Sequence, residues 1–221
     1  MFIDRTGKFV YLLGSLLVLL IAGAFFQHIT LGNVIFNILL SVTLLATIYA
    51  ISQDRRFVLA GILLGSLTFS AAWVTHLSSS PTPGLIAAFL GFCYFLYAAF
   101  VILMHVFRAR IITVDELLAS VSTYLLIRIG GGFIFRFLEL IDPSALITTT
   151  AAVSEITAVS PMNAYIYYSF TCLTTLGFGD VIPGTAEARV FSYLGAVIGQ
   201  IFLTVLIARI VSLRISQNSR R

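Results

Sequence analysis

Charged residues are scarce in this sequence. Asp, Glu, Lys and Arg together make up 10% of its 221 residues, whereas a soluble globular chain carries about 25%. Hydrophobic residues make up 59%, and the mean hydropathy is +1.05. This balance all but excludes a soluble globular protein and predicts an integral membrane protein.

Motifs of energy-coupled transport and of enzymatic chemistry are also missing. The sequence has no P-loop of the form GxxxxGK[ST], and it has no nucleophile–base set or His/Asp cluster. Its two cysteines, Cys93 and Cys172, lie in apolar runs, which favours packed thiols over a disulfide or a metal pair. The basic residues do not form one patch, so nucleic acid is not an expected partner. We therefore expect neither enzymatic activity nor a cofactor.

Apolar runs long enough to cross a bilayer, which takes about 20 residues, recur along the chain. They cover residues 9–26, 31–51, 57–77, 85–107, 117–141 and 190–213. Another apolar stretch, residues 165–175, is too short to span and predicts a re-entrant helix. The sequence thus predicts an all-α integral membrane protein with six transmembrane helices and one re-entrant helix.

Lys and Arg are distributed unevenly between the two sides of this topology. One side carries Arg5, Lys8, Arg55, Arg56, Arg108, Arg110, Arg214, Arg220 and Arg221. The other carries Arg189 and, near the end of the fifth span, Arg136. Because basic residues favour the cytoplasmic side, we expect both termini in the cytoplasm, in a multi-pass protein of the plasma membrane. We expect no cytosolic ligand-binding domain.

Several local signals support this map. Thr113 and Glu116 form a capping-box pattern at the start of the fifth span. Pro161 suits the first position of the short helix, and the polar segment 148–159 before it predicts an outer loop. The glycine triplet 130–132 favours close helix packing, with a kink as the alternative.

The segment TTLGFGD, residues 174–180, follows the short helix and precedes the last span. Non-helical backbone at membrane depth is tolerated where protein covers it or where it lines a water-filled path. Gly177 and Gly179 allow backbone conformations that other residues avoid. The carbonyls of residues 175–178 could then point toward one axis, and rings of such carbonyls replace the hydration shell of a cation. The order of short helix, glycine loop and full span therefore predicts a pore loop.

The residues Thr175-Leu176-Gly177-Phe178-Gly179-Asp180 resemble the Thr-x-Gly-Tyr/Phe-Gly-Asp filter signature of the tetrameric potassium channel family. The resemblance covers the chain from residue 111 to the end. It implies that K+ is bound by the backbone carbonyls of Thr175, Leu176, Gly177 and Phe178 and by the Thr175 hydroxyl, with Gly179 completing the filter. It also implies that Thr174, Tyr167, Tyr168 and Asp180 support the filter.

The same resemblance divides the chain into two units. A four-helix transmembrane domain covers residues 1–110, and a pore domain covers residues 111–221. The pore domain is expected to contain an outer helix at 114–141, a pore helix at 161–174, the filter at 175–180 and an inner helix at 187–213. Gly199 lies where the inner helix of these channels often has its hinge glycine, and helical spacing places Ile201, Thr204 and Ala208 as cavity and gate residues.

The sequence departs from the family pattern in two places. Leu176 and Phe178 replace the commoner Val and Tyr, which leaves the backbone ligands intact but removes one hydroxyl. The fourth span, residues 85–107, carries no charge, although voltage-gated relatives have arginines there. Since each gating charge contributes about 2.3 kcal/mol per 100 mV, we do not expect steep voltage gating.

Two arginines interrupt the fifth span. Arg128 and Arg136 lie eight residues apart and so fall on roughly one helix face. Intramembrane arginines are costly and rarely face lipid. A structural role is favoured for both, but Arg128 could instead move with gating. The sequence does not say whether Arg128 meets a carbonyl, a hydroxyl or a lipid headgroup.

Together these features predict a potassium-selective channel that conducts K+ passively. One filter loop cannot close a ring, so a homotetramer in contact with membrane lipids is expected. A less selective cation channel, a secondary potassium transporter with several pore loops and a non-conducting scaffold remain alternatives. The gating stimulus and any regulatory partner are not identified by the sequence.

Overall fold

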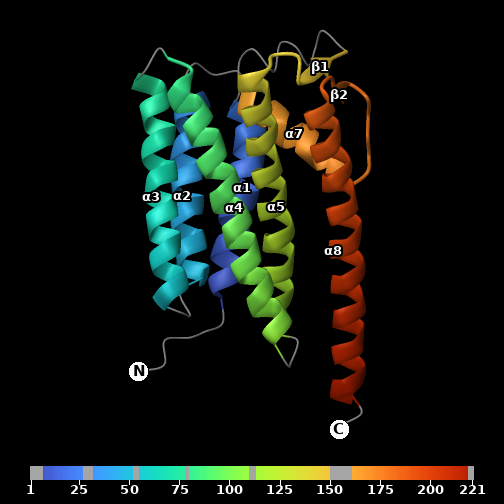
Figure 1. Cartoon of the computed structure of the whole chain (residues 1–221). Coiled ribbons are helices and arrows are strands. Elements are labelled where there is room, and N and C mark those ends of the chain that lie inside the picture. The colour runs from blue at the N-terminus through green and yellow to red at the C-terminus, as the bar shows by residue number, and fades with distance from the viewer. Residues whose placement is uncertain are drawn as a thin grey trace.

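The computed structural model of the chain describes residues 7–26, 32–51, 55–77, 80–109, 113–149 and 161–218. These residues form seven helices and two short strands (Figure 1). The helices are α1 (Lys8–Phe26), α2 (Gly32–Ile51), α3 (Arg55–Leu77), α4 (Thr82–Arg108), α5 (Val114–Ile141), α7 (Pro161–Leu173) and α8 (Ala186–Asn218). The strands are β1 (Leu146–Thr148) and β2 (Val181–Pro183). Of the predicted outer loop 148–159, all but the first two residues lie outside the described part of the chain.

The long helices α1–α5 and α8 run alternately up and down, so α1 begins and α8 ends at the same end of the molecule (Figure 1). Among the described helices, five are apolar and long enough to cross a membrane. Their spans are Val34–Ile51, Arg55–Thr75, Thr82–Arg108, Val114–Ile141 and Ala186–Ser212, and α1 contributes a shorter apolar stretch, Lys8–Gly23. This helical, apolar architecture fits the predicted integral membrane protein, while the count of six spans stays a prediction.

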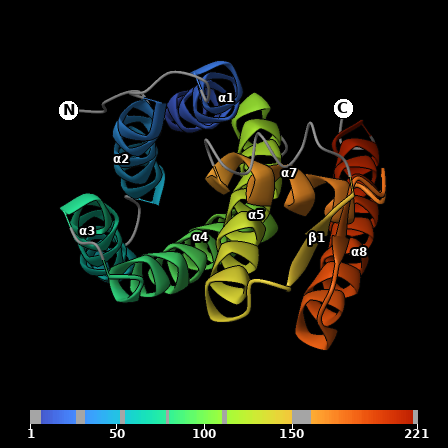
Figure 2. The ribbon, with the colours of Figure 1, turned by 90° about the horizontal axis from the view of Figure 1, so that it is seen from above.

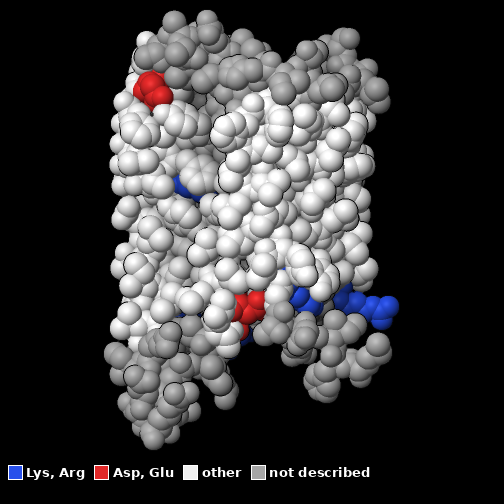
Figure 3. Space-filling model, turned by 180° about the vertical axis from the view of Figure 1, so that it is seen from behind, with Lys and Arg blue, Asp and Glu red and all other residues white. Residues whose placement is uncertain are grey.

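The charged surface of the molecule follows the same axis. On the face seen in Figure 3, the red and blue surface lies mostly near the two ends, and the band between them is almost entirely white. Lys8 and Arg55 begin α1 and α3, and Arg108 ends α4, and these three helix ends lie toward the lower end of the molecule in Figure 1. An uncharged band between charged ends is the surface expected of a protein that lies across a bilayer.

Helix α5 joins the N-terminal helices to the rest of the chain. Viewed from above, α1–α4 form an arc around one side of α5, and α7 lies between α5 and α8 (Figure 2). The buried core at the α4–α5 contact includes Phe95 and Phe133, whose rings stack with centroids 5.5 Å apart. Tyr94 on α4 donates a hydrogen bond to the Leu44 carbonyl at 2.8 Å and so fixes α4 to α2.

Both ends of α5 carry local signals that explain its length. Thr113 and Glu116 form the predicted capping box, which satisfies free amides of the first turn. At the other end the Asp142 carboxylate accepts hydrogen bonds from the Ser144 hydroxyl at 2.7 Å and the Ser144 amide at 2.8 Å. These bonds lower the pKa of Asp142 and turn the chain toward β1.

The glycine triplet sets how closely α5 packs against its neighbours. A Cβ on Gly130 would meet the Phe95 Cβ at 3.2 Å, and one on Gly132 would meet the Ile166 backbone at 3.0 Å. A Cβ on Gly131 would overlap the Ser169 hydroxyl. The triplet therefore permits close packing of α4 and α7 against α5, as predicted, and α5 stays helical through all three glycines.

Strands β1 and β2 form a small antiparallel sheet that the sequence does not predict. The register pairs Leu146 with Pro183, Ile147 with Ile182 and Thr148 with Val181. This sheet joins the segment after α5 to the segment after the glycine loop. It therefore anchors the chain immediately after residues 174–180 to the segment that follows α5.

Two helices of the expected pore domain differ slightly from their predicted bounds. α7 ends at Leu173 rather than at residue 174, because Thr175 takes a positive φ of 59° that no α-helix accommodates. α8 begins at Ala186 and continues to Asn218, past the predicted end at residue 213. Its last residues, 214–218, are mostly polar, but they contain no Gly or Pro that would end the helix. The length of the apolar run therefore underestimates the length of the helix.

Candidate functional site

The glycine loop that follows α7 is positioned by the packing of that helix. The Tyr168 hydroxyl lies 2.7 Å from the Ser192 hydroxyl of α8. The Tyr168 ring contacts the Phe135 ring of α5 edge-on, with centroids 4.7 Å apart. α7 is therefore clamped between α5 and α8, and its C-terminal end fixes where the loop starts.

The amides of the loop fold back onto the last turn of α7. The amides of Thr174 and Thr175 donate to the carbonyls of Phe170 and Cys172 at 3.1 and 3.0 Å. The amides of Leu176 and Gly177 both donate to the Thr171 carbonyl, at 3.0 and 3.3 Å. These bonds satisfy carbonyls that the end of α7 would otherwise leave unpaired. They also fix the backbone of the loop to the last turn of α7.

The carbonyls of the same loop are left free. Positive φ angles occur at alternate residues, 59° at Thr175, 56° at Gly177 and 80° at Gly179. Alternating backbone handedness turns successive carbonyls toward one side, whereas an extended strand points them to opposite sides. Within the described residues, no hydrogen bond is donated to the carbonyls of residues 175–178. The loop thus presents a row of unpaired oxygens.

This row lies on the surface of the single chain. Residues 175–179 are all exposed, and Leu176 and Phe178 keep 60% and 66% of their surface. Apolar side chains this exposed at the membrane level are expected to meet lipid or another protein chain. The geometry can bind a dehydrated cation if further chains complete the ring.

The outer end of the loop, residues 178–180, is held by Tyr167 and Thr149. The Tyr167 hydroxyl donates to the Asp180 carboxylate at 2.6 Å, and the Tyr167 ring is parallel to the Phe178 ring at 6.4 Å. Thr149, next to β1, donates its amide to the Asp180 carbonyl at 2.8 Å and its hydroxyl to the Gly179 carbonyl at 3.0 Å. The structure therefore brings the predicted support residues Tyr167 and Asp180 together. Phe178, which lacks the hydroxyl of the commoner Tyr, stacks its ring on the Tyr167 ring.

The inner end of the loop is held by two threonine hydroxyls and one side-chain amide. The hydroxyl of Thr174 donates to the Phe170 carbonyl at 2.6 Å, and that of Thr175 donates to the Thr174 carbonyl at 2.6 Å. Gln200 on α8 donates its side-chain amide to the Thr175 hydroxyl at 3.4 Å. The predicted filter residues therefore form one continuous segment, supported by Gln200 and Thr149, which are not among the residues predicted from the sequence.

Gln200 could have been found from the sequence, whereas Thr149 could not. Gln200 is an uncharged amide in a strongly apolar span, and polar side chains at such depth are often functional. Thr149 lies in a segment without periodicity, and its role depends on a strand pairing formed across more than thirty residues.

The predicted gate and cavity residues lie along α8. Gly199 is buried against α7, and a Cβ there would overlap the Leu173 carbonyl. Ile201, Thr204 and Ala208 are exposed on the single chain. Gly199 thus has a visible packing role, and α8 is continuous through it.

Near its lower end, α8 is fastened to the C-terminus of α4. Arg209 donates hydrogen bonds to the carbonyls of Val106 at 3.2 Å and Ala109 at 3.0 Å, and also to the Phe107 carbonyl. Its guanidinium lies 4.9 Å from the centre of the Phe107 ring. A cation suits the unpaired carbonyls of a helix C-terminus, so this contact couples the four-helix unit to α8.

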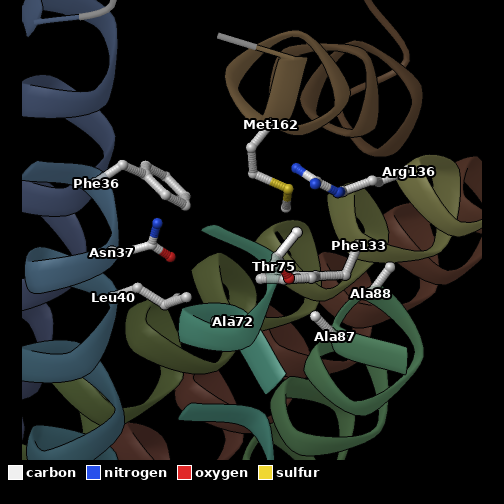
Figure 4. Close-up of a pocket in the computed structure, with 10 residues that line it drawn as sticks. All are labelled: Phe36, Asn37, Leu40, Ala72, Thr75, Ala87, Ala88, Phe133, Arg136 and Met162. Atoms are coloured by element: carbon white, nitrogen blue, oxygen red, sulfur yellow. The ribbon is translucent and has the colours of Figure 1, made fainter. Parts of the chain in front are cut away.

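The two intramembrane arginines line different cavities. Arg136 extends toward a cavity of about 130 Å³ among α2, α3, α4, α5 and α7, with Phe36 and Met162 on its walls (Figure 4). Arg128 lines a second cavity of about 190 Å³ behind α7. The Arg128 guanidinium donates to the Ser169 hydroxyl at 3.4 Å, and Ser169 donates back to the Arg128 carbonyl at 2.8 Å. A hydroxyl is therefore the hydrogen-bond partner of Arg128.

Loss of the Tyr167 hydroxyl should loosen the outer end of the loop. A hydrogen bond to a charged group contributes roughly 1.5–3 kcal/mol, and 1 kcal/mol shifts the unfolding temperature of a chain this size by about 2–4 °C. We expect Tyr167→Phe to lower the midpoint of thermal unfolding by a few degrees, and Tyr193→Phe, which changes an exposed tyrosine of α8, to leave it unchanged.

The Asp180→Ala background separates this bond from other effects of the ring. With the acceptor already gone, Tyr167→Phe should have no further effect on the unfolding midpoint. An equal decrease in both backgrounds would contradict the assignment of the bond.

Comparison with known proteins relates this geometry to one family. Neither curated proteins nor solved structures gave a match to the chain. Residues 125–215, however, match a family model described as ion channel. The matched region begins in α5 and includes α7, the glycine loop, β2 and most of α8. The match therefore supports an ion channel family, and passive ion conduction, for the part of the chain that holds this loop.

Proposed function

We propose that this protein is a potassium-selective channel that conducts K+ passively through a homotetrameric pore. The observation that carries the proposal is the row of carbonyls at residues 175–178, which accept no hydrogen bond from the described residues. Four such rows around an axis would supply the oxygen rings that replace the hydration shell of K+. In this proposal Thr175, Leu176, Gly177 and Phe178 are the ion ligands.

The exposed loop supports assembly around it. A single chain leaves the loop and most of α8 uncovered, whereas closed symmetric assembly would bury both. The alternative of a single-chain transporter requires further loops of this kind, and among the described residues positive φ angles at alternate positions occur in this loop alone.

The structure of α4 favours weak voltage dependence. His105 and Arg108 lie in its last turn, and the rest of the helix is uncharged. With no charge placed to move through the membrane field, the open probability should change little with voltage. We place the basic end of the molecule, with both termini, in the cytoplasm of a plasma-membrane protein.

Flux from liposomes tests this function directly. The purified protein, reconstituted at a K+ gradient, should release K+ and shift the reversal potential toward that of K+. Replacing external K+ with Na+ should move the reversal potential strongly. A reversal potential insensitive to this exchange supports the less selective cation channel, and absence of any flux supports a scaffold.

The mass of the detergent-solubilised protein tests the assembly. A particle of four chains is expected. A functional particle containing one chain would contradict the ring and favour the transporter.

A further inference from the structure

Arg136 is an intramembrane arginine whose guanidinium is accessible from a cavity. The side chain comes from α5, is partly buried, and extends into the space between α2 and α7 (Figure 4). Among the described residues it has no ion-pair or hydrogen-bond partner, and Glu139, one turn further along α5, is not paired with it. Nε and Nη2 of Arg128 are buried and unpaired, whereas no nitrogen of Arg136 is buried in this way. Arg136 therefore offers N–H donors to a ligand.

The cavity in front of Arg136 has room and a suitable lining for an anionic group. Its volume is about 130 Å³, far more than the roughly 10–15 Å³ that one water molecule needs. Asn37 and Thr75 add polar atoms, while Phe36 and Met162 supply apolar wall (Figure 4). No acidic side chain is among the described residues that line it. The fork of a guanidinium binds a carboxylate or a phosphate through two N–H groups.

The depth of Arg136 in the membrane favours phosphate. α5 has 28 residues, so at 1.5 Å per residue it is about 42 Å long, close to the 40–45 Å or so of a bilayer with its headgroups. Arg136 lies five residues before Ile141, the last residue of α5, and thus roughly 8 Å from the helix end. A hydrocarbon core of about 30 Å begins roughly 6 Å from that end. Arg136 therefore lies near the boundary of the headgroup layer, where a membrane holds its phosphates.

We propose that this cavity binds a phosphate group, with two phosphate oxygens on the guanidinium of Arg136. A phospholipid headgroup and a free phosphate share this chemistry, and in the lipid the glycerol carbons would lie against Phe36 and Met162. None of the described lining residues belongs to α8 or to the glycine loop, so the surfaces that the proposed assembly covers are not part of the site. Binding is independent of conduction, so this proposal and the channel function can fail separately.

Native mass spectrometry of the full chain, purified in detergent and freed of lipid, counts bound phospholipid without a flux measurement. Dioleoylphosphatidylglycerol is the probe, and dioleoylglycerol, which has the same chains and no phosphate, is its control. Basic residues at the other end of the molecule also attract anionic lipid, so the readout is the difference between variants. Arg136→Gln should bind one phosphatidylglycerol fewer per chain. Its Kd at this site should rise at least about tenfold, the effect of one charge-assisted hydrogen bond.

Matched variants separate the site from general effects of charge and folding. Arg189→Gln is the same change at an arginine of α8 that bonds to the carbonyls of Pro183 and Gly184, and it should bind lipid like the wild type. Arg136→Lys keeps the charge and should keep most of the binding. Ala72→Phe fills the cavity from α3 and leaves Arg136 in place. It should lose the same lipid as Arg136→Gln, so the test survives misfolding of Arg136→Gln.

Inorganic phosphate separates the two sources of the group. At a headgroup site, it should neither displace the lipid that depends on Arg136 nor change the unfolding midpoint of the lipid-free protein. At a site for free phosphate, it should raise that midpoint in the wild type and not in Arg136→Gln.

Three results would overturn the proposal. If neither phosphatidylglycerol nor inorganic phosphate distinguishes the wild type from Arg136→Gln, the cavity holds a hydrated arginine only. If binding of dioleoylglycerol depends on Arg136 to the same degree, the phosphate is not the group recognised. If Ala72→Phe binds both ligands like the wild type, the cavity is not where they bind.

Discussion

Gly177→Ala is expected to abolish potassium flux while leaving the fold of each chain intact. Gly177 has a φ of 56°, and a Cβ built there meets no atom within 4 Å in the single chain. The methyl group therefore has room, and the cost lies in the backbone. An L-residue in this left-handed region costs about 1–2 kcal/mol, which is tolerable for the stability of one chain.

The same cost is multiplied in the proposed ring. Four strained copies amount to roughly 4–8 kcal/mol, and relaxation of φ would turn the neighbouring carbonyls away from the axis. Because each 1.36 kcal/mol changes a rate about tenfold, we expect potassium flux to fall at least about a hundredfold. The measurement is K+ release from liposomes reconstituted with equal amounts of wild-type and variant protein.

Gly14→Ala is the matched control. Gly14 lies in α1 and has an ordinary helical φ, and a methyl group added there would also meet no atom within 4 Å. This variant should conduct like the wild type. Wild-type flux from Gly177→Ala would show that the carbonyls of residues 175–178 are not the ion path, and the proposed filter would have to be abandoned.

The features that the sequence predicts best depend on neighbouring residues. The apolar lengths of α2–α5 and α8, the capping box of Thr113 and Glu116, and the tight packing of the glycine triplet each follow from a short stretch of chain. Such signals rest on helix length, side-chain reach and the absence of a Cβ, which do not require knowledge of distant partners. Local chemistry was therefore sufficient for these elements.

The contacts that the sequence did not predict join residues far apart in the chain. Thr149 reaches the carbonyls of Gly179 and Asp180, and Arg209 reaches the end of α4. The β1–β2 pairing has only three residues on each strand, too few for a period-2 pattern. Each contact exists because the packing of α5, α7 and α8 brings its partners together. The sequence around either partner does not by itself predict that packing.

Arg128 is a residue whose importance the sequence indicates but whose partner it does not predict. The sequence shows a costly charge in mid-span, but the Ser169 partner lies forty-one residues away. The cavity beside it is formed by four helices at once. The sequence therefore shows that Arg128 needs a partner, but identifying that partner and the cavity requires the arrangement of α4, α5, α7 and α8.

Gly199→Ala should destabilise the protein, and this separates a packing role from the predicted hinge role. A Cβ on Gly199 would overlap the Leu173 carbonyl at the end of α7, and that backbone atom cannot rotate away. Overpacking of a well-filled contact typically costs about 1–3 kcal/mol. At about 2–4 °C per kcal/mol for a chain of this size, the midpoint of thermal unfolding should fall by several degrees.

Gly195→Ala, one turn earlier on the same helix, provides the control. Its nearest neighbour would be the Cys172 Cβ at 4.0 Å, an ordinary contact. Alanine is favoured over glycine in a helix interior by roughly 0.5–1 kcal/mol, so this variant should unfold at the wild-type temperature or slightly above it. The two substitutions add the same methyl group to the same helix and should have opposite effects.

A hinge makes a different prediction for the same pair. If Gly199 served only to let α8 bend, alanine would change channel opening and leave the unfolding midpoint unchanged or raised, because helix propensity improves. If it serves to seat α8 against α7, the midpoint falls, and flux falls with it, since Leu173 lies two residues before Thr175 and Gln200 adjoins Gly199. Equal midpoints for Gly199→Ala and Gly195→Ala would contradict the packing role and return Gly199 to the hinge.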